Sequence, residues 1–302
     1  MSSGFTDHDV PDLTGRTLMV TGANTGLGFA AARVLAERGA RVLLGCRSDE
    51  KANGAMDAIR RDVPDADLAS VPLDLGDLAS VEAAAETVAG TESLDVLVNN
   101  AGVMMPPLQF TTDGFESQFG VNHLGTFALT CRLLDALGEQ PGSRVVVTSS
   151  IAHRGARITF DDLGAEEGYG AQARYGQSKL ANLLFTYELD RRLRTSGSST
   201  IAVACHPGIA TTELTRHLPK VVQLAMPLAR PFLNSAEQGA WPTLMAATSS
   251  SIDGGDYLGP SRFGETSGPA EHVTSTSASH DHDLAHRLWD VSVEMTGVDP
   301  GI

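Results

Sequence analysis

The chain has 302 residues, 42% of them hydrophobic, and its 22 basic against 37 acidic side chains give a net charge of −15. This length suits one large or two small domains, with ample apolar material for a core. An acidic surface argues against binding to the phosphate backbone of a nucleic acid, although a local basic pocket could still hold one anionic cofactor.

Three cysteines, Cys46, Cys131 and Cys205, stand far apart in apolar segments. This spacing favours buried thiols in a reducing compartment over disulfides or metal ligands. The N-terminus is polar and acidic, and no apolar run approaches the ~18 residues of a membrane span. We therefore expect a cytoplasmic protein without an integral membrane segment.

Short apolar strands alternate with helical patterns along most of the chain. The predicted strands are 16–22, 40–46, 69–74, 94–100, 143–150, 199–208 and 255–259, and the predicted helices are 27–37, 50–61, 78–88, 122–137 and 174–185. This α/β alternation is typical of a doubly wound parallel sheet with helices on both faces. No linker-like composition interrupts it, so a single Rossmann domain over 1–302 is expected.

The first predicted strand leads into TGANTGLG, Thr21 to Gly28, and then into a helix. Glycines let the backbone approach a pyrophosphate, which the helix N-terminus can hold through its free amides and its dipole. A purely structural turn is the alternative, but the flanking strand and helix favour a dinucleotide site. Its predicted members are Gly22, Asn24, Thr25, Gly26, Leu27 and Gly28.

Two further loops at strand ends fit the same ligand. Asp74, followed by Leu75, could accept a hydrogen bond from an adenine amino group, and NNAG offers small residues at Asn100, Ala101 and Gly102. Either loop alone could be a simple turn. Three such loops at successive carboxyl ends of one parallel sheet predict a crevice.

The end of the second predicted strand, LLGCRS, indicates which dinucleotide binds. Arg47 stands where a 2′-phosphate would lie, and Cys46 replaces the acidic residue that usually binds a free ribose hydroxyl. Ser48 adds a hydroxyl group. We expect NADP as the cofactor, with an ordinary surface arginine as the alternative interpretation.

The segment RYGQSKLANLLF places Tyr175 and Lys179 four residues apart, on one face of a predicted apolar helix. Carbonyl reduction needs a proton at oxygen, and a free tyrosine with a pKa near 10 exchanges protons poorly at neutral pH. A cation about 5 Å away, at an effective dielectric near 20, would lower that pKa by about two units. The pair therefore predicts a general acid/base, with an amphipathic helix edge and a snorkelling lysine as the alternative.

Together these motifs resemble the short-chain dehydrogenase/reductase family over nearly the whole chain. The matching segments are TGANTGLG, NNAG, VNHLG, VTSS, YGQSK and HPG at 206–208. The wording SKLANLLF, the tail RLWDVS and the long segment between Ser150 and Tyr175 look most like the branch of retinol dehydrogenases and protochlorophyllide reductases.

The resemblance implies a role for each motif residue. It implies that Tyr175 is the acid/base, Lys179 binds the nicotinamide ribose, Ser150 steadies the substrate oxygen and Asn122 holds a water that relays protons. Ser149 is the rival for the serine role, and Asn122 could equally be a helix cap. The resemblance also implies nicotinamide contacts at Pro207, Gly208 and Thr212, beside His206, which is interpreted as a core histidine.

The expected activity is NADP-dependent interconversion of a carbonyl and an alcohol on a small-molecule substrate, with a homo-oligomer as a family tendency. One alternative is another reaction on the same scaffold, such as epimerisation, dehydration or reduction of a carbon–carbon double bond. The other is a cofactor-binding regulator without turnover, against which the complete motif set argues.

The segment 213–234, which follows HPG, is predicted to be a substrate lid. Its apolar residues are interrupted by Pro219, Pro227 and Pro231, which favours short helical pieces joined by kinks. An apolar lid would exclude water and favour a hydrophobic substrate. An oligomer interface or a membrane-dipping surface is the alternative.

The histidine-rich segment HDHDLAH, 280–286, offers His282 and His286 one helical turn apart. No third convergent metal ligand is evident in the sequence. A solvated helix start is therefore favoured, and no metal site is predicted.

Overall fold

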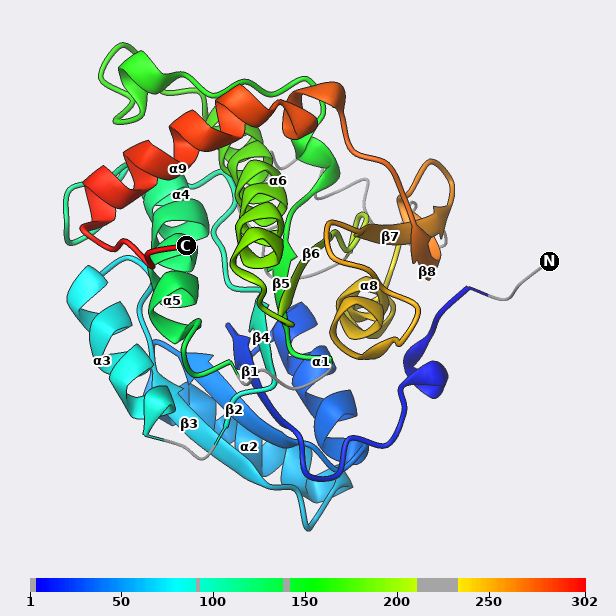
Figure 1. Ribbon diagram of the computed structural model, residues 1–302. Helices are drawn as coiled ribbons and strands as arrows, with labels where there is room; N and C mark the ends of the chain where they lie inside the picture. Colours follow the sequence, from blue (N-terminus) through cyan, green and yellow to red (C-terminus); the bar gives the residue numbers. More distant parts are fainter. Residues whose placement is uncertain (1–3, 91–92, 138–141, 211–232) are drawn as a thin grey trace.

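The computed structural model describes residues 4–90, 93–137, 142–210 and 233–302. Eight strands form one sheet in the order β3-β2-β1-β4-β5-β6-β7-β8 (Figure 1). All neighbouring pairs are parallel except β7 and β8, which form an antiparallel hairpin. The strands are β1 Thr17–Thr21, β2 Arg41–Cys46, β3 Leu68–Pro72, β4 Val96–Asn99, β5 Arg144–Thr148, β6 Ile201–Cys205, β7 Tyr257–Arg262 and β8 Ser267–His272.

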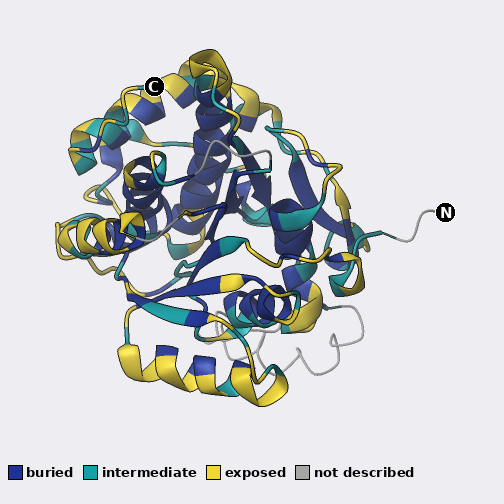
Figure 2. Ribbon diagram, turned by 60° about the horizontal axis from the view of Figure 1, so that its bottom comes forward, coloured by how far each residue is buried: buried dark blue, intermediate teal, exposed yellow. Residues whose placement is uncertain are grey.

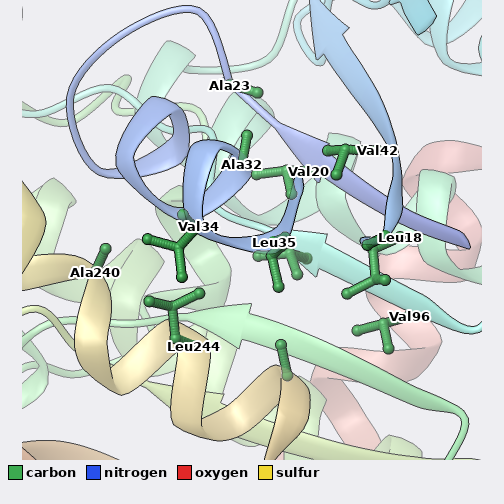
Figure 3. Packing of buried hydrophobic residues seen from close by; sticks show 14 of the residues in the cluster. Leu18, Val20, Ala23, Ala32, Val34, Leu35, Val42, Val96, Ala240 and Leu244 are labelled. Atoms are coloured by element: carbon green, nitrogen blue, oxygen red, sulfur yellow. The ribbon is translucent and has the colours of Figure 1, made fainter. Parts of the chain in front are cut away.

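Helices cover both faces of this sheet, which confirms the predicted α/β fold class. Leu18 and Val20 of β1 pack in one cluster with α1 and α8 (Figure 3), while Met19 between them packs in a second cluster with α3, α5 and α6. Side chains alternate between the faces of a strand, so a sheet covered twice produces the continuous apolar runs of the sequence. The helices are α1 Gly26–Glu37, α2 Asp49–Asp62, α3 Leu78–Ala89, α4 Ser117–Phe119, α5 Gly125–Leu133, α6 Ala171–Ser196, α8 Ala236–Thr248 and α9 His282–Thr296.

Burial follows these layers. Figure 2 shows buried strands at the centre and helices whose outer faces are exposed. The three cysteines are free and buried, as the sequence predicted. No helix in the described ranges is long and apolar enough to cross a membrane.

The helix predicted from Asn122 begins earlier than expected. The chain becomes helical at α4, passes through a π-helical turn, Gly120–Leu124, and continues as α5. The carboxylate of Glu116 starts the helix by accepting hydrogen bonds from the backbone amides of Gln118 and Phe119, each at 2.9 Å. Asn122 therefore lies inside a helical segment, and its interpretation as a helix cap is wrong.

Two elements have no counterpart in the sequence analysis. Helix α8 starts with a capping box between Ser235 and Gln238, and β8 pairs with β7 through a register shift near Pro260. The residue Phe5 also bridges to Ala270 of β8, so the edge strand is held by distant parts of the chain.

The histidine-rich segment begins α9, with Asp281 as the N-cap that accepts a hydrogen bond from the Leu284 amide at 2.9 Å. His286 pairs with Asp290 at 3.1 Å on the exposed face. Over the described ranges, no three metal-binding side chains gather at one point. The predicted lid at 213–234 lies outside the described residues except for its last two positions, and Thr212 also lies outside them.

Candidate active site

A cleft of about 550 Å³ runs along the carboxyl ends of the parallel strands, within the size range typical of cofactor and substrate pockets. Its wall contains the predicted residues Gly22, Asn24, Thr25, Gly26, Leu27, Gly28, Arg47, Ser48, Asp74, Leu75, Asn100, Ala101, Gly102, Tyr175, Lys179 and Pro207. The wall also contains Ser149, the alternative for the serine role. It further contains residues that the sequence analysis did not assign to the site, namely Gly45, Lys51, Leu73, Val103, Val121 and Thr148.

The glycine-rich turn is shaped by close backbone contacts. Gly22 has a φ of +67°, a conformation that favours glycine. A Cβ atom on Gly28 would lie 2.5 Å from the Asn100 side chain, so this position has no room for one. The Thr21 hydroxyl accepts a hydrogen bond from the Asn100 amide at 3.0 Å, which fixes the NNAG loop against the first turn. The start of α1, which carries no acidic residue in its first turn, can therefore hold a phosphate group at this edge.

Two cations lie at the end of the cleft next to β2. Arg47 and Lys51 are both exposed, and Ser48 between them caps α2 by accepting a hydrogen bond from the Lys51 amide at 3.3 Å. In the loop after the neighbouring strand β3, Asp74 accepts a hydrogen bond from the Gly76 amide at 2.9 Å, which shapes this loop. In a chain of net charge −15, this pair of cations forms a local site for an anion.

The other end of the cleft is buried. Tyr175 and Lys179 of α6 are 9% and 4% exposed, and the Lys179 Nζ atom lies 5.7 Å from the centre of the Tyr175 ring. Lys179 donates a hydrogen bond to the Thr148 carbonyl at 3.0 Å.

The expected lowering of the Tyr175 pKa by Lys179 is wrong for the net shift. Burial raises the pKa of Tyr175, and a hydrogen bond with Ser150 only partly opposes it. Burial also lowers the pKa of Lys179 to about 8. Burial therefore outweighs the hydrogen bond with Ser150, and the phenol stays protonated in the free protein.

The two adjacent serines have different partners. The Ser149 hydroxyl donates a hydrogen bond to the Lys179 carbonyl at 2.8 Å, although this residue lines the cleft. Ser150 shares a hydrogen bond with the Tyr175 side chain, and its hydroxyl also accepts from the Ala152 amide at 3.2 Å. The contact with Tyr175 favours Ser150 over Ser149 as the serine that meets a substrate oxygen.

Asn122 lies behind the cleft wall and is fully buried. Its side chain exchanges hydrogen bonds with the backbone of Val103 at 2.7 and 2.9 Å, and donates to the Ser178 hydroxyl at 3.0 Å. Both amide protons are therefore engaged, and a water could be held only by the backbone carbonyl or the remaining lone pair of Oδ1. The residue joins the NNAG loop to the helix that carries Tyr175 and Lys179.

The turn after β6 closes the buried end. Pro207 lines the cleft, and its carbonyl accepts a hydrogen bond from the Asn234 side chain at 3.1 Å. Gly208 has a φ of +71°, and a Cβ atom there would lie 2.4 Å from the Thr266 carbonyl. This close approach requires glycine and fixes the turn against the β7–β8 hairpin.

Parallel strands with a glycine turn at one end of a cleft and a buried tyrosine–lysine pair at the other define a dinucleotide-dependent oxidoreductase. The sequence profile of the short chain dehydrogenase family matches residues 16–222. The chain therefore belongs to the short-chain dehydrogenase/reductase family.

Individual relatives place the chain within that family. Retinol dehydrogenase 12 of Mus musculus is 42% identical over 289 residues, which cover 95% of this chain and 88% of that protein. An uncharacterized protein from Mycobacterium paratuberculosis has a structure that superimposes with a TM-score of 0.83 at 38% identity, over 99% of this chain and 100% of that one. The RhlG/NADP active-site complex of Pseudomonas aeruginosa superimposes with a TM-score of 0.65 at 26% identity, over 82% of this chain and 94% of that one. The protein is an oxidoreductase of the carbonyl/alcohol type in the retinol dehydrogenase branch.

Proposed function

We propose that the protein uses NADP to interconvert an apolar carbonyl compound and its alcohol. The observation that carries this proposal is one continuous cleft with exposed cations, Arg47 and Lys51, at its β2 end and the buried pair Tyr175 and Lys179 at its β5 end. Arg47 and Lys51 would hold the 2′-phosphate of a dinucleotide bound in this cleft, and Tyr175 and Lys179 would border its nicotinamide half.

The residues of the buried end divide the chemistry between them. Bound NADPH supplies the hydride. Tyr175 has a raised pKa, stays protonated and donates its proton to the carbonyl oxygen. Ser150, already hydrogen-bonded with Tyr175, donates to the same oxygen and orients it. Lys179 is anchored by the Thr148 carbonyl and binds the ribose with its remaining protons.

Two kinds of observation support an apolar substrate. Ile209, directly after the Pro207–Gly208 turn, is 39% exposed, and Phe263 at the tip of the neighbouring hairpin is 63% exposed. The Ile209 amide donates a hydrogen bond to Thr266 of that hairpin at 2.9 Å, so both apolar side chains belong to the same edge of the protein. Two relatives are named retinol dehydrogenases, and retinol is an apolar alcohol. Exposed apolar side chains beside a cleft favour an apolar ligand.

Calorimetry with NADPH and NADH tests the cofactor, and absorbance of the reduced nicotinamide tests the substrate. A charge-assisted bond from Arg47 to a 2′-phosphate predicts roughly 10- to 150-fold tighter binding of NADPH. Long-chain and aromatic aldehydes should turn over faster than sugar aldehydes at equal concentration. Equal or tighter binding of NADH would overturn the cofactor assignment, and faster turnover of sugars would overturn the substrate class.

A further inference from the structure

His206 connects the cofactor cleft to the β7–β8 hairpin. It follows β6, directly precedes Pro207 of the cleft wall, and has an exposed fraction of 0%. Its Nδ1 atom lies 3.2 Å from the Gly208 amide, and its Nε2 atom lies 3.1 Å from the Glu265 carboxylate. The hydrogen bond to Gly208 holds the turn that carries Pro207.

These two contacts determine where the proton of His206 resides. A backbone amide can only donate, so Nδ1 must be the acceptor and must carry no proton. The proton of the neutral ring then sits on Nε2 and is donated to Glu265. Protonation of Nδ1 would abolish the bond from Gly208, and burial lowers the pKa of His206 to about 4 against the opposing effect of Glu265.

Glu265 extends this contact to the loop of the reactive serine. Its second carboxylate oxygen accepts a hydrogen bond from Arg154 at 2.7 Å. Arg154 ends the short helical turn Ile151–His153, whose N-cap is Ser150. A single carboxylate therefore joins the turn after β6 to the loop after β5, the two backbone segments that border the buried end of the cleft.

The other groups that face His206 complete the cluster. His153 donates from Nδ1 to the Ser150 carbonyl at 2.6 Å, because a carbonyl can only accept. Tyr257 of β7 packs against both histidine rings, with centroid distances of 5.7 and 5.2 Å. A Cβ atom on Gly259 would lie 2.1 Å from the His206 ring, so the hairpin is shaped to admit this imidazole.

We propose that His206 and Glu265 are positioning residues. They hold the Pro207–Gly208 turn and the Ser150 loop in a fixed relative position, in which the cleft binds the nicotinamide half of the dinucleotide. The proposal rests on the proposed use of NADP. It assigns no contact between the pair and the adenosine half, because Arg47, Ser48 and Asp74 follow β2 and β3, on the far side of β1 and β4 from β6.

The test compares binding of NADP⁺ with binding of 2′,5′-ADP, which has the 2′-phosphate but no nicotinamide. His206→Leu removes both contacts and should weaken NADP⁺ about 3- to 10-fold, the share of one or two hydrogen bonds, with 2′,5′-ADP unchanged. His206→Asn can still accept from the Gly208 amide and should restore most of the affinity. Glu265→Gln keeps an acceptor for Nε2 but weakens the tie to Arg154, and should have an intermediate effect.

His272→Leu is the matched control, because it breaks a similar pair with Asp256 at 3.0 Å on the exposed side of the same hairpin. It should change neither affinity. The affinity for NADP⁺ divided by the affinity for 2′,5′-ADP also supplies a pH test. This ratio should fall in the wild type below about pH 5. It should stay constant in His206→Asn, because that variant has no Nδ1 atom to protonate.

Each result decides between the proposals. An equal loss of both ligands in the His206 and Glu265 variants would indicate general unfolding and overturn the positioning role. Unchanged NADP⁺ binding in those variants would overturn it as well, with the proposed function intact. Failure of the wild type to bind either ligand would overturn the proposed function and this inference together.

Discussion

The two ends of the cleft differ in how far their ionisable side chains are exposed to solvent. At the β2 end, Arg47 and Lys51 are exposed, so their charges remain hydrated in the free protein and their presence costs little stability. At the β5 end, Tyr175, Lys179 and His206 are almost completely buried. Burial shifts the pKa of each of these three groups toward its neutral form.

This difference in burial determines where function and stability are coupled. A buried ionisable group acts on the reaction and on the folded state at once, because its desolvation is part of the folding free energy. An exposed cation can be changed with little effect on the fold. We therefore expect substitutions at the buried end to alter chemistry or acid stability strongly, and substitutions at the exposed end to alter cofactor choice selectively.

The largest effect is expected for Tyr175→Phe. Loss of the phenolic proton donor should reduce turnover by roughly 10²- to 10⁴-fold, the usual share of a general acid. NADP binding should stay within a few-fold of the wild type, because Lys179 and the rest of the cleft wall are retained. Single-turnover kinetics with an apolar aldehyde and calorimetry with NADP⁺ measure the two quantities, and near wild-type turnover would remove Tyr175 from the mechanism.

Acid stability should depend on two buried histidines. Burial lowers the pKa of His206 to about 4 and that of His123, which contacts the Ser292 hydroxyl at 2.8 Å, to about 3. The unfolded chain protonates both near pH 6.5, so their contribution is complete above that pH. It is lost as the pH falls from about 6.5 toward 4 for His206 and toward 3 for His123, at about 1.4 kcal/mol per pH unit for each.

Urea unfolding at a series of pH values checks this slope. His206→Asn should reduce the slope between pH 6 and 4 by the share of one histidine, because asparagine does not titrate. Parallel curves for the wild type and His206→Asn would contradict the assignment.

The strands of the sheet could be predicted because their signals are local. Burial on both faces makes each parallel strand a continuous apolar run, and the glycine turns and strand-end motifs follow directly in sequence. Strand β8 gave no such signal. It contains two glycine or proline positions in SGPAEH and is held by pairing with β7 and by the bridge from Phe5 to Ala270, which are contacts from other parts of the chain.

The sequence predicts which residues form the site, but not the direction in which their pKa values are shifted. Residue type and spacing identify Tyr175 and Lys179, yet the direction of the Tyr175 pKa depends on burial by segments far away in sequence. His206 was interpreted as a core histidine, and it is indeed buried. Its partner Glu265 lies 59 residues further along the chain, a separation at which no sequence spacing predicts contact.

At the exposed end, Arg47→Ala should lower the preference for NADP over NAD by roughly 10- to 150-fold, through loss of a charge-assisted bond. Unfolding free energy should change by less than about 0.5 kcal/mol, as is usual for surface positions. Calorimetry with both dinucleotides and thermal unfolding test the two statements. Lys51→Ala is the companion variant, and a larger loss there than at Arg47 would transfer the main phosphate contact to Lys51.

The smallest effect is expected at Ser48, where cofactor binding and helix capping meet in one hydroxyl. Ser48→Ala should cost about 1 kcal/mol of unfolding free energy through loss of the α2 cap, and should weaken NADP only about 2- to 10-fold. Asp281→Ala is the matched control, because Asp281 caps α9 through the Leu284 amide and does not line the cleft. It should cost similar stability with NADP affinity unchanged. An equal loss of NADP affinity in both variants would mean that Ser48 acts through the stability of the fold, and the separation between the two ends of the cleft would then fail at this residue.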